Sequence, residues 1–230
     1  MTRFDFYYFL TLGILALVFL GVPLSCSKPH APAPPAKPLT VIEQQHSATH
    51  RIGVYEQFEG DPHKDFGEAG HCSGTAVARN ALLTAQHCFK DSNLIRIDDD
   101  PTPTVILAAL IDGNDHVIYI VRHEFTHWAN IDQRPLVDGE HVHMWGAPGK
   151  NTNVYRVGYY VWLASEPEID KHFMLQQFVL PTYRGDSGAG IFDEHGSVVA
   201  VITFADESAN ELSEPLQFTD EQLDVLGEVQ

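Results

Sequence analysis

The sequence predicts an all-β domain between residues 48 and 206, and three observations predict it. Short stretches rich in Val, Ile, Tyr, Phe and Trp recur along this region, and turns rich in Gly, Pro, Asn and Asp separate them. β-Branched and aromatic residues favour strands, and turns at this spacing are typical of sandwiches and barrels. No long helical pattern precedes residue 206. The many short strands indicate a pair of β-barrels.

The N-terminal segment, residues 1–25, is predicted to be a secretory signal peptide or a membrane anchor. Residues 6–20 are almost wholly apolar, a length between that of a signal-peptide core and that of a full membrane span. Leu24-Ser25-Cys26 resembles the end of a bacterial lipobox, although Pro23 departs from it, so Cys26 is a candidate for lipidation. Lipoprotein, uncleaved anchor and plain secretion all place the protein outside the cytoplasm. We expect it in the cell envelope, on the periplasmic or extracellular face.

Residues 26–47 are predicted to be a linker. Its first part, SKPHAPAPPAKP, is rich in Pro and Ala and lacks the apolar side chains that a core needs. Such a composition favours an extended, semi-rigid spacer. The spacer fits a domain that its N-terminal segment or a lipid holds at a distance from a membrane.

The charge of the chain is strongly negative and unevenly placed. The formal net charge of −17 argues against nucleic acid or an anionic membrane surface as an electrostatic partner. No Lys or Arg follows Arg184, and eight carboxylates lie between residues 206 and 228. We interpret residues 207–230 as an acidic tail that is mainly solvated, with a short capped helix over 219–226.

A predicted hairpin carries two cysteines and a histidine. A strand follows Cys72, a turn lies at Asn80, and residues 81–85 form a second strand that leads into His87 and Cys88. Three cysteines in an exported protein suggest one disulfide and one odd thiol.

The motifs around this hairpin resemble those of the chymotrypsin-type serine proteases. Cys72-Ser73-Gly74 and the later Thr84-Ala85-Gln86-His87-Cys88 are similar to that family's pattern, in which a TAAHC motif carries the general base. The resemblance implies that His87 is the general base. It also implies a disulfide between Cys72 and Cys88, which are 16 positions apart as in the family.

A catalytic triad also needs a carboxylate that orients the imidazole. Downstream of His87 the candidates are Asp112, Asp115 and Asp132. The segment from Gly113 to Val121 resembles the family's NDIALL segment, in which an aspartate opens a buried strand. The resemblance therefore favours Asp115.

The nucleophile is predicted within RGDSGAG, residues 184–190. A serine among glycines can present its hydroxyl while neighbouring N–H groups converge beside it. The bare pattern is equally typical of a tight hairpin turn. The resemblance implies that Ser187 is the nucleophile and that the N–H groups of Gly185 and Ser187 form the oxyanion hole. Ala189 departs from the usual second glycine, and the usual proline is absent.

The family pattern also implies a pocket for the substrate side chain that precedes the cut. Its residues are Pro181, Thr182, Thr203, Phe204 and Ala205. No acid stands at Pro181 to receive Arg or Lys, and Ala205 replaces a usual glycine. We therefore expect small or medium apolar side chains there.

Activation by proteolysis is a separate question. Arg51-Ile52 superficially resembles the family's activating cut, after which the new amine pairs with an aspartate in the position of Asp186. Gly53-Val54 does not match the sequence that usually follows the cut. We expect Ile52 to lie in an ordinary first strand, with no zymogen step.

A rival motif, His123-Glu124-Phe125-Thr126-His127, matches HExxH. On a helix this motif presents two zinc ligands and a general base. The β-branched and aromatic residues before it predict a strand instead, and the possible third ligands, Glu140, His141 and His143, form no recognisable site. We expect no metal.

The resemblance extends over about 155 residues and completes the fold prediction. It implies two six-stranded antiparallel barrels of the chymotrypsin type, at about 48–122 and 138–206, with the active site in the cleft between them. The predicted function is a serine endopeptidase, monomeric and without a cofactor, that acts on a protein or peptide. The alternatives are an inactive protease-like binding module and, less favoured, a zinc metallopeptidase that uses HEFTH.

Overall fold

The computed structural model of the protein describes residues 38–56, 67–89, 93–149, 151, 153–161, 176–205 and 211–228. The predicted signal or anchor, Cys26 and the spacer up to residue 37 lie outside the described residues. No helix within the described ranges is long and apolar enough to cross a bilayer.

The first half of the domain is a closed barrel of six strands. Neighbouring strands are antiparallel, in the order β1-β2-β3-β6-β5-β4. The strands are β1 (Thr49–Glu56), β2 (Gly67–Ala78), β3 (Ala81–Ala85), β4 (Leu94–Ile97), β5 (Thr104–Ile111) and β6 (His116–Val121). Ile52, Leu82, Ile95 and Val117 are among the side chains of its core. Ile52 lies in the middle of β1, as expected, and is fully buried.

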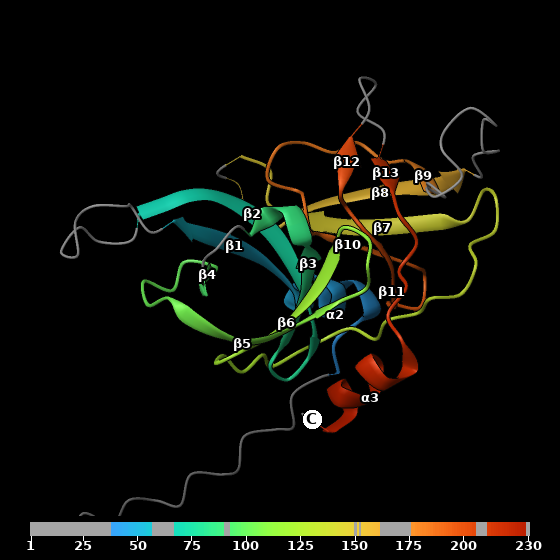
Figure 1. Ribbon diagram of the computed structural model, residues 1–230. Coiled ribbons are helices and arrows are strands. Elements are labelled where there is room, and N and C mark those ends of the chain that lie inside the picture. Colours follow the sequence, from blue (N-terminus) through green and yellow to red (C-terminus); the bar gives the residue numbers. More distant parts are fainter. Residues whose placement is uncertain are drawn as a thin grey trace, which may run out of the picture. The chain divides into compact units, whose positions relative to one another are not determined.

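The second half is a curled sheet of seven strands in the order β11-β10-β7-β8-β9-β13-β12. The strands are β7 (His141–Gly146), β8 (Val154–Val161), β9 (Gln176–Val179), β10 (Gly190–Phe192), β11 (Val198–Val201), β12 (Phe204–Ala205) and β13 (Glu211–Ser213). Only Ile202 and Thr203 separate β11 from β12, the two ends of the sheet, so the sheet curls back on itself. If β11 and β12 are counted as one bent strand, the second sheet has the six strands that were predicted. The predicted fold class is confirmed (Figure 1).

A shared apolar core joins the two halves. Leu83 and Ile118 of the barrel pack in one buried cluster with Phe192 and Val198 of the second sheet and Phe218 beyond β13. Burial of apolar side chains is the main favourable term in folding. This cluster therefore holds β3 and β6 of the barrel close to β10, which begins at the last residue of the RGDSGAG segment.

The folded domain begins earlier than the linker prediction allowed. Residues 26–47 were expected to form a linker, but helix α2 occupies Val41–Ala48. Thr40 and Glu43 form a reciprocal capping box at its start, which satisfies N–H groups that would otherwise lack partners. The helix buries Gln45 and Ala48 against the domain. Thr40 and Glu43 have the spacing of a capping box, so the sequence did contain this signal.

The C-terminal segment also differs from its prediction. We expected a mainly solvated acidic tail, and its described part instead adds β13 to the sheet and then forms helix α3 (Asp220–Glu228). Leu216, Phe218 and Leu226 are buried between the acidic residues. The apolar side chains hold the segment against the domain, while Asp220, Glu221 and Asp224 of α3 are exposed. The helix itself was expected, over 219–226.

Candidate active site

His87 lies where the barrel strand β3 ends. It is the middle residue of a single 3₁₀ turn, η1 (Gln86–Cys88), and the next residue is bonded to β2 through the Cys72–Cys88 disulfide. The predicted disulfide is confirmed, with an S–S distance of 2.05 Å. A cross-link beside the histidine restricts the backbone that carries the imidazole.

Asp115 lies between β5 and β6 and contacts His87 twice. Its Oδ2 is 2.5 Å from Nδ1 of the imidazole, and its Oδ1 accepts the His87 N–H at 2.8 Å. The other two candidates are elsewhere: Asp112 pairs with His116, and Asp132 pairs with Arg134. The structure thus brings the favoured candidate, and neither alternative, to the histidine.

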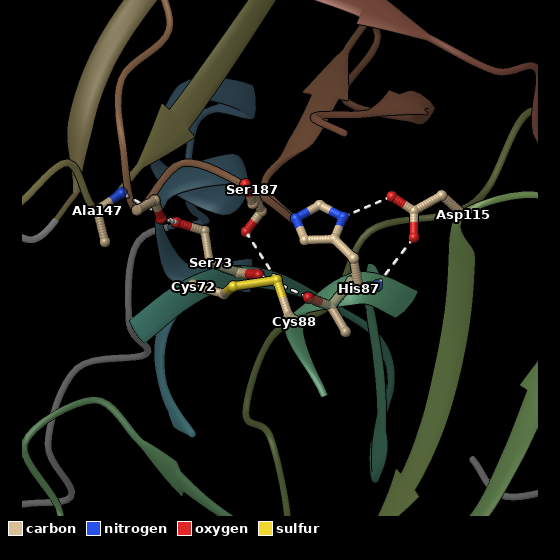
Figure 2. The surroundings of a disulfide bond; sticks show 9 residues. Cys72, Ser73, His87, Cys88, Asp115, Ala147 and Ser187 are labelled. Atoms are coloured by element: carbon tan, nitrogen blue, oxygen red, sulfur yellow. Dashed lines mark hydrogen bonds and ion pairs between the residues drawn. A yellow bond between two sulfur atoms is a disulfide. The ribbon is translucent and has the colours of Figure 1, made fainter. Parts of the chain in front are cut away.

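Ser187 lies on the other side of the same ring. Figure 2 shows its side chain across the His87 imidazole from Asp115. The carbonyl of Ser187 accepts the Ser73 N–H at 2.8 Å, which ties the serine to strand β2 of the barrel. The three residues of the predicted triad therefore lie in the order carboxylate, imidazole, hydroxyl. A carboxylate on Nδ1 leaves Nε2 as the nitrogen that faces the hydroxyl.

The two N–H groups predicted to form the oxyanion hole belong to peptide groups whose carbonyl oxygens each accept a backbone hydrogen bond. The carbonyl preceding Gly185 accepts the Gly149 N–H at 2.9 Å, and the carbonyl preceding Ser187 accepts the Ala189 N–H at 2.8 Å. The C=O and N–H of a trans peptide point in opposite directions, so these bonds fix the directions of both amides. Within the described part of the chain, neither amide donates a hydrogen bond to a protein acceptor. Such amides can bind an anionic oxygen.

Gly185 is required by its conformation and by its neighbours. Its φ is +102°, a region that glycine enters readily and other residues resist. A Cβ at this position would lie 2.5 Å from the carbonyl oxygen of Ala147 and from Nε2 of His71. Any other residue would therefore displace the loop that carries the amides.

Ser73 was part of the recognised motif, but no role was predicted for it. Its Oγ donates to the carbonyl of Gly185 at 2.8 Å and accepts the Ala147 N–H at 3.0 Å (Figure 2). One hydroxyl thus connects the barrel to two loop segments of the second half, one after β7 and one before β10. Both partners are backbone groups far away in the sequence, so no local pattern could have indicated this contact.

Asp186, next to the nucleophile, pairs with an internal arginine. Its carboxylate is fully buried and contacts Arg156 of β8 at 2.6 and 3.2 Å, and it also accepts the Tyr183 N–H at 2.8 Å. A buried charge needs an opposite charge and hydrogen bonds to replace its hydration. Arg156 and Tyr183 supply these, and the sequence had suggested only a new chain terminus as a partner for Asp186.

The predicted pocket residues are only partly described. Pro181 is exposed, and its carbonyl accepts Arg156 Nη1 at 3.2 Å, whereas Thr182 and Thr203 are buried. Phe204 and Ala205 form strand β12, and their side chains lie outside the described residues. The preference for small or medium apolar side chains stays a prediction.

The HEFTH segment does not form the helix on which the zinc alternative depends. It follows β6 as an irregular connection, and Glu124 pairs with Arg79 at 2.8 Å. Burial and the neighbouring His50 lower the pKa of His123, although Asp100 and Asp98 oppose them. Among the described residues, no group of three or more His, Cys, Asp or Glu side chains is arranged to hold a metal ion.

Comparison with known proteins identifies relatives of this arrangement. A family profile described as trypsin-like peptidase domain matches residues 72–201, more than half of the chain. No curated protein matches the chain significantly in sequence.

Three solved structures illustrate the similarity in fold. The Rv3671c protease in its inactive form has a TM-score of 0.62 at 18% identity, over 84% of this chain and 99% of its own. The active form of Rv3671c from M. tuberculosis has a TM-score of 0.61 at 18% identity, over 81% and 84%. A serine endoprotease from Yersinia pestis has a TM-score of 0.59 at 14% identity, over 83% and 68%.

Proposed function

The chain belongs to the trypsin-like peptidase family, and we propose that it is an active serine endopeptidase that hydrolyses peptide bonds through Ser187, His87 and Asp115. The observation that carries the proposal is the contact of Asp115 with Nδ1 and the N–H of His87, with Ser187 across the ring. In such a triad the carboxylate holds the imidazole in the tautomer whose Nε2 accepts a proton.

Acylation begins when Ser187 Oγ attacks the carbonyl carbon of the scissile peptide. The hydroxyl proton moves to Nε2 of His87, and Asp115 stabilises the imidazolium while remaining ionised. The negative charge that develops on the carbonyl oxygen is stabilised by the N–H groups of Gly185 and Ser187. His87 then donates the proton to the leaving amine, the C–N bond breaks, and an ester to Ser187 remains.

Deacylation repeats these steps with water. His87 removes a proton from a water molecule whose oxygen attacks the ester carbon, and the same two amides stabilise the second oxyanion. The proton then passes from His87 to Ser187 Oγ as the C–O bond breaks. The products are the original enzyme and a peptide carboxylic acid, which releases its proton to solvent to give the carboxylate.

A fluorophosphonate probe tests this assignment, because it phosphonylates a serine only where a base and an oxyanion site activate it. We expect the wild-type protein to be labelled and Ser187→Ala to be unlabelled, with an unchanged far-UV circular dichroism spectrum. Ser197→Ala, which removes a serine hydroxyl from the turn between β10 and β11, is the matched control and should label like the wild type. Label on Ser187→Ala would refute the assignment, and an unlabelled wild type would favour the inactive binding module.

We also propose that the enzyme is exported, is held at the cell envelope by its N-terminal segment, and needs no activating cut. The disulfide supports export, because such bonds persist in oxidising compartments. The Arg156–Asp186 pair supports activity without a cut, because the carboxylate already has a cation. Mass spectrometry of the N-terminus of active protein, purified from its native membrane, tests both points. A lipid on Cys26 or an intact anchor would support tethering, and a start at Ile52 would overturn the absence of a cut.

A further inference from the structure

A buried carboxylate of the C-terminal segment contacts the backbone of the residue that orients His87. Glu214 follows β13, is 6% exposed, and accepts the Asp115 N–H on its Oε2 at 2.8 Å. No Lys, Arg or His of the described residues lies within ion-pair distance of Glu214. A buried carboxylate is costly unless hydrogen bonds replace its hydration. The bond to Asp115 is therefore a contact that the fold keeps despite that cost.

The same segment holds the whole loop that carries Asp115. We name residues 213–222 the C-terminal strap and residues 111–115 the Asp115 loop. Three further hydrogen bonds join them: Gln222 Nε2 to Ile111 O at 2.9 Å, Gln217 N to Asp112 Oδ2 at 3.2 Å, and Asn114 Nδ2 to Pro215 O at 2.8 Å. Figure 1 shows the red chain running from β13 to α3.

The strap is itself anchored in the core, so it can transmit rigidity to the loop. Leu216 and Phe218 are buried in the cluster that joins the two halves of the domain. The backbone of Phe218 exchanges two hydrogen bonds with the Gln133 side chain, at 2.7 and 2.9 Å. Side chains locked by packing give more precise support than a free loop would.

Asp115 is held from two directions. Its side chain contacts His87, and its carbonyl accepts the Gln86 N–H at 2.9 Å, so one side is tied to the 3₁₀ turn η1. Its amide is tied to Glu214 on the strap. Loss of the acceptor would leave this amide unpaired and free the loop to shift.

We propose that Glu214 is a positioning residue of the active site: its carboxylate holds the Asp115 backbone where the Asp115 side chain keeps both contacts with His87. This inference rests on the proposed peptidase function. Displacing a catalytic group by about 1 Å can reduce the rate about 100-fold. Because substrate binding does not involve Asp115, the loss should appear in kcat rather than in KM.

The test compares Glu214→Ala, which removes the acceptor, with Glu214→Gln, which keeps an acceptor oxygen at the same position. For hydrolysis of a chromogenic peptide we expect kcat of Glu214→Ala to fall about 10- to 100-fold with KM within about threefold of wild type. Glu214→Gln should keep at least about a third of the wild-type kcat. The control Asp224→Ala removes an exposed carboxylate of α3 and should match the wild type.

A double variant separates positioning from a general structural role. If Glu214 acts through Asp115, then Glu214→Ala should cost less than about threefold in kcat when Asp115 is already Asn, because the effects of coupled residues are not additive. Equal losses in the two backgrounds would overturn the inference, as would a Glu214→Ala enzyme with the wild-type kcat or equal losses in the Ala and Gln variants. If Glu214→Ala does not fold, Glu214→Met takes its place with the same expectations.

These results are distinguishable from failure of the proposed function. Fluorophosphonate labelling of the wild type, absent in Ser187→Ala, together with hydrolysis of the chromogenic peptide, establishes the activity of Ser187 independently of Glu214. An unlabelled wild type refutes the function and the inference together, whereas a labelled wild type with unaffected Glu214 variants refutes the inference alone.

Discussion

The Asp115 loop provides the aspartates of two histidine–aspartate pairs. The two pairs have similar hydrogen-bond distances but differ in their exposure and in what surrounds the second ring nitrogen. Nδ1 of His87 lies 2.5 Å from Asp115, and Nδ1 of His116 lies 2.8 Å from Asp112. In the first pair the side chains are 42% and 17% exposed, and the second nitrogen of the ring faces Ser187. In the second pair both side chains are fully buried, and Nε2 of His116 has no hydrogen-bond partner among the described residues.

The difference teaches that the pair itself does not determine the role. Asp112 also accepts the N–H groups of Asn114 and Gln217, so it shapes the loop and holds the strap. The His116 imidazole is fully buried, so it is not placed to contact a substrate. The two pairs therefore differ in what the second ring nitrogen contacts, which is Ser187 in the proposed catalytic pair and no described hydrogen-bond partner in the buried pair.

Neutralising the first pair should have the largest effect. Asp115→Asn removes the charge that stabilises the imidazolium and allows the wrong tautomer of His87, so we expect kcat to fall about 10⁴-fold. Fluorophosphonate labelling should slow in parallel, and the urea-unfolding midpoint should change little because this pair is partly exposed. An activity within tenfold of wild type would mean that Asp115 is not the orienting carboxylate.

Neutralising Asp112 in the second pair should have the opposite effect, with a large loss of stability and a small loss of kcat. Asp112→Asn places an amide where a buried carboxylate accepts several hydrogen bonds, so we expect a loss of about 3 kcal/mol in the free energy of unfolding. In a domain of this size that corresponds to a decrease of about 6–12 °C in Tm. The kcat of the folded fraction at low temperature should stay within about tenfold of wild type, since no contact to His87 is lost. A stable but inactive Asp112→Asn would contradict the comparison.

A third pair extends the comparison to the surface and should show the smallest effect. Nδ1 of His50 lies 2.7 Å from Asp98, whose side chain is 47% exposed. Burial raises the pKa of Asp98, but the hydrogen bond and charge of His50 and the Arg51 N–H outweigh it, so the net pKa is lowered. A carboxyl with a lower pKa in the folded than in the unfolded state stabilises the fold above its unfolded pKa. That stability is lost as the pH falls through the folded pKa.

The substitution Asp98→Asn measures how much the His50–Asp98 pair contributes to the free energy of unfolding. Asn tolerates the φ of +51° at this position, and we expect a loss of at most about 1 kcal/mol at pH 7 because solvent screens the pair. The difference from wild type should shrink as the pH falls below about 4, where the carboxyl of the unfolded chain is protonated. Urea unfolding at pH 7 and at pH 3 provides the measurement. If the stability difference between wild type and Asp98→Asn grew at low pH, the pKa of Asp98 would not be lowered by folding.

Local patterns were sufficient to predict much of the fold. Strand β3 has the expected bounds, residues 81–85, because the turn at Asn80 precedes it and the His87-Cys88 motif follows it. The Cys72–Cys88 bridge was predicted from its spacing within the family motif. The strands β4 and β5 were not predicted. Leu94–Ile97 is only four residues long, and exposed apolar side chains blur the alternation in β5.

The supports of the candidate site could not be predicted in this way. Ser73, Arg156 and Glu214 act on partners 112, 30 and 99 positions away. Such contacts arise from tertiary packing, and each residue alone is compatible with a solvated surface. Glu214 was the most misleading of the three, because its acidic surroundings predict exposure and only the buried Leu216 and Phe218 beside it indicate otherwise.

The position of Glu214 in the chain also has a consequence for biosynthesis. A ribosome makes the polypeptide from its N-terminus, so His87, Asp115 and Ser187 all emerge before residue 214. If Asp115 depends on Glu214, a nascent chain that already contains the whole triad still lacks the group that holds its carboxylate in place. The strap is therefore the last part of the site to be synthesised, and a chain that ended before residue 214 would lack the acceptor for the Asp115 N–H.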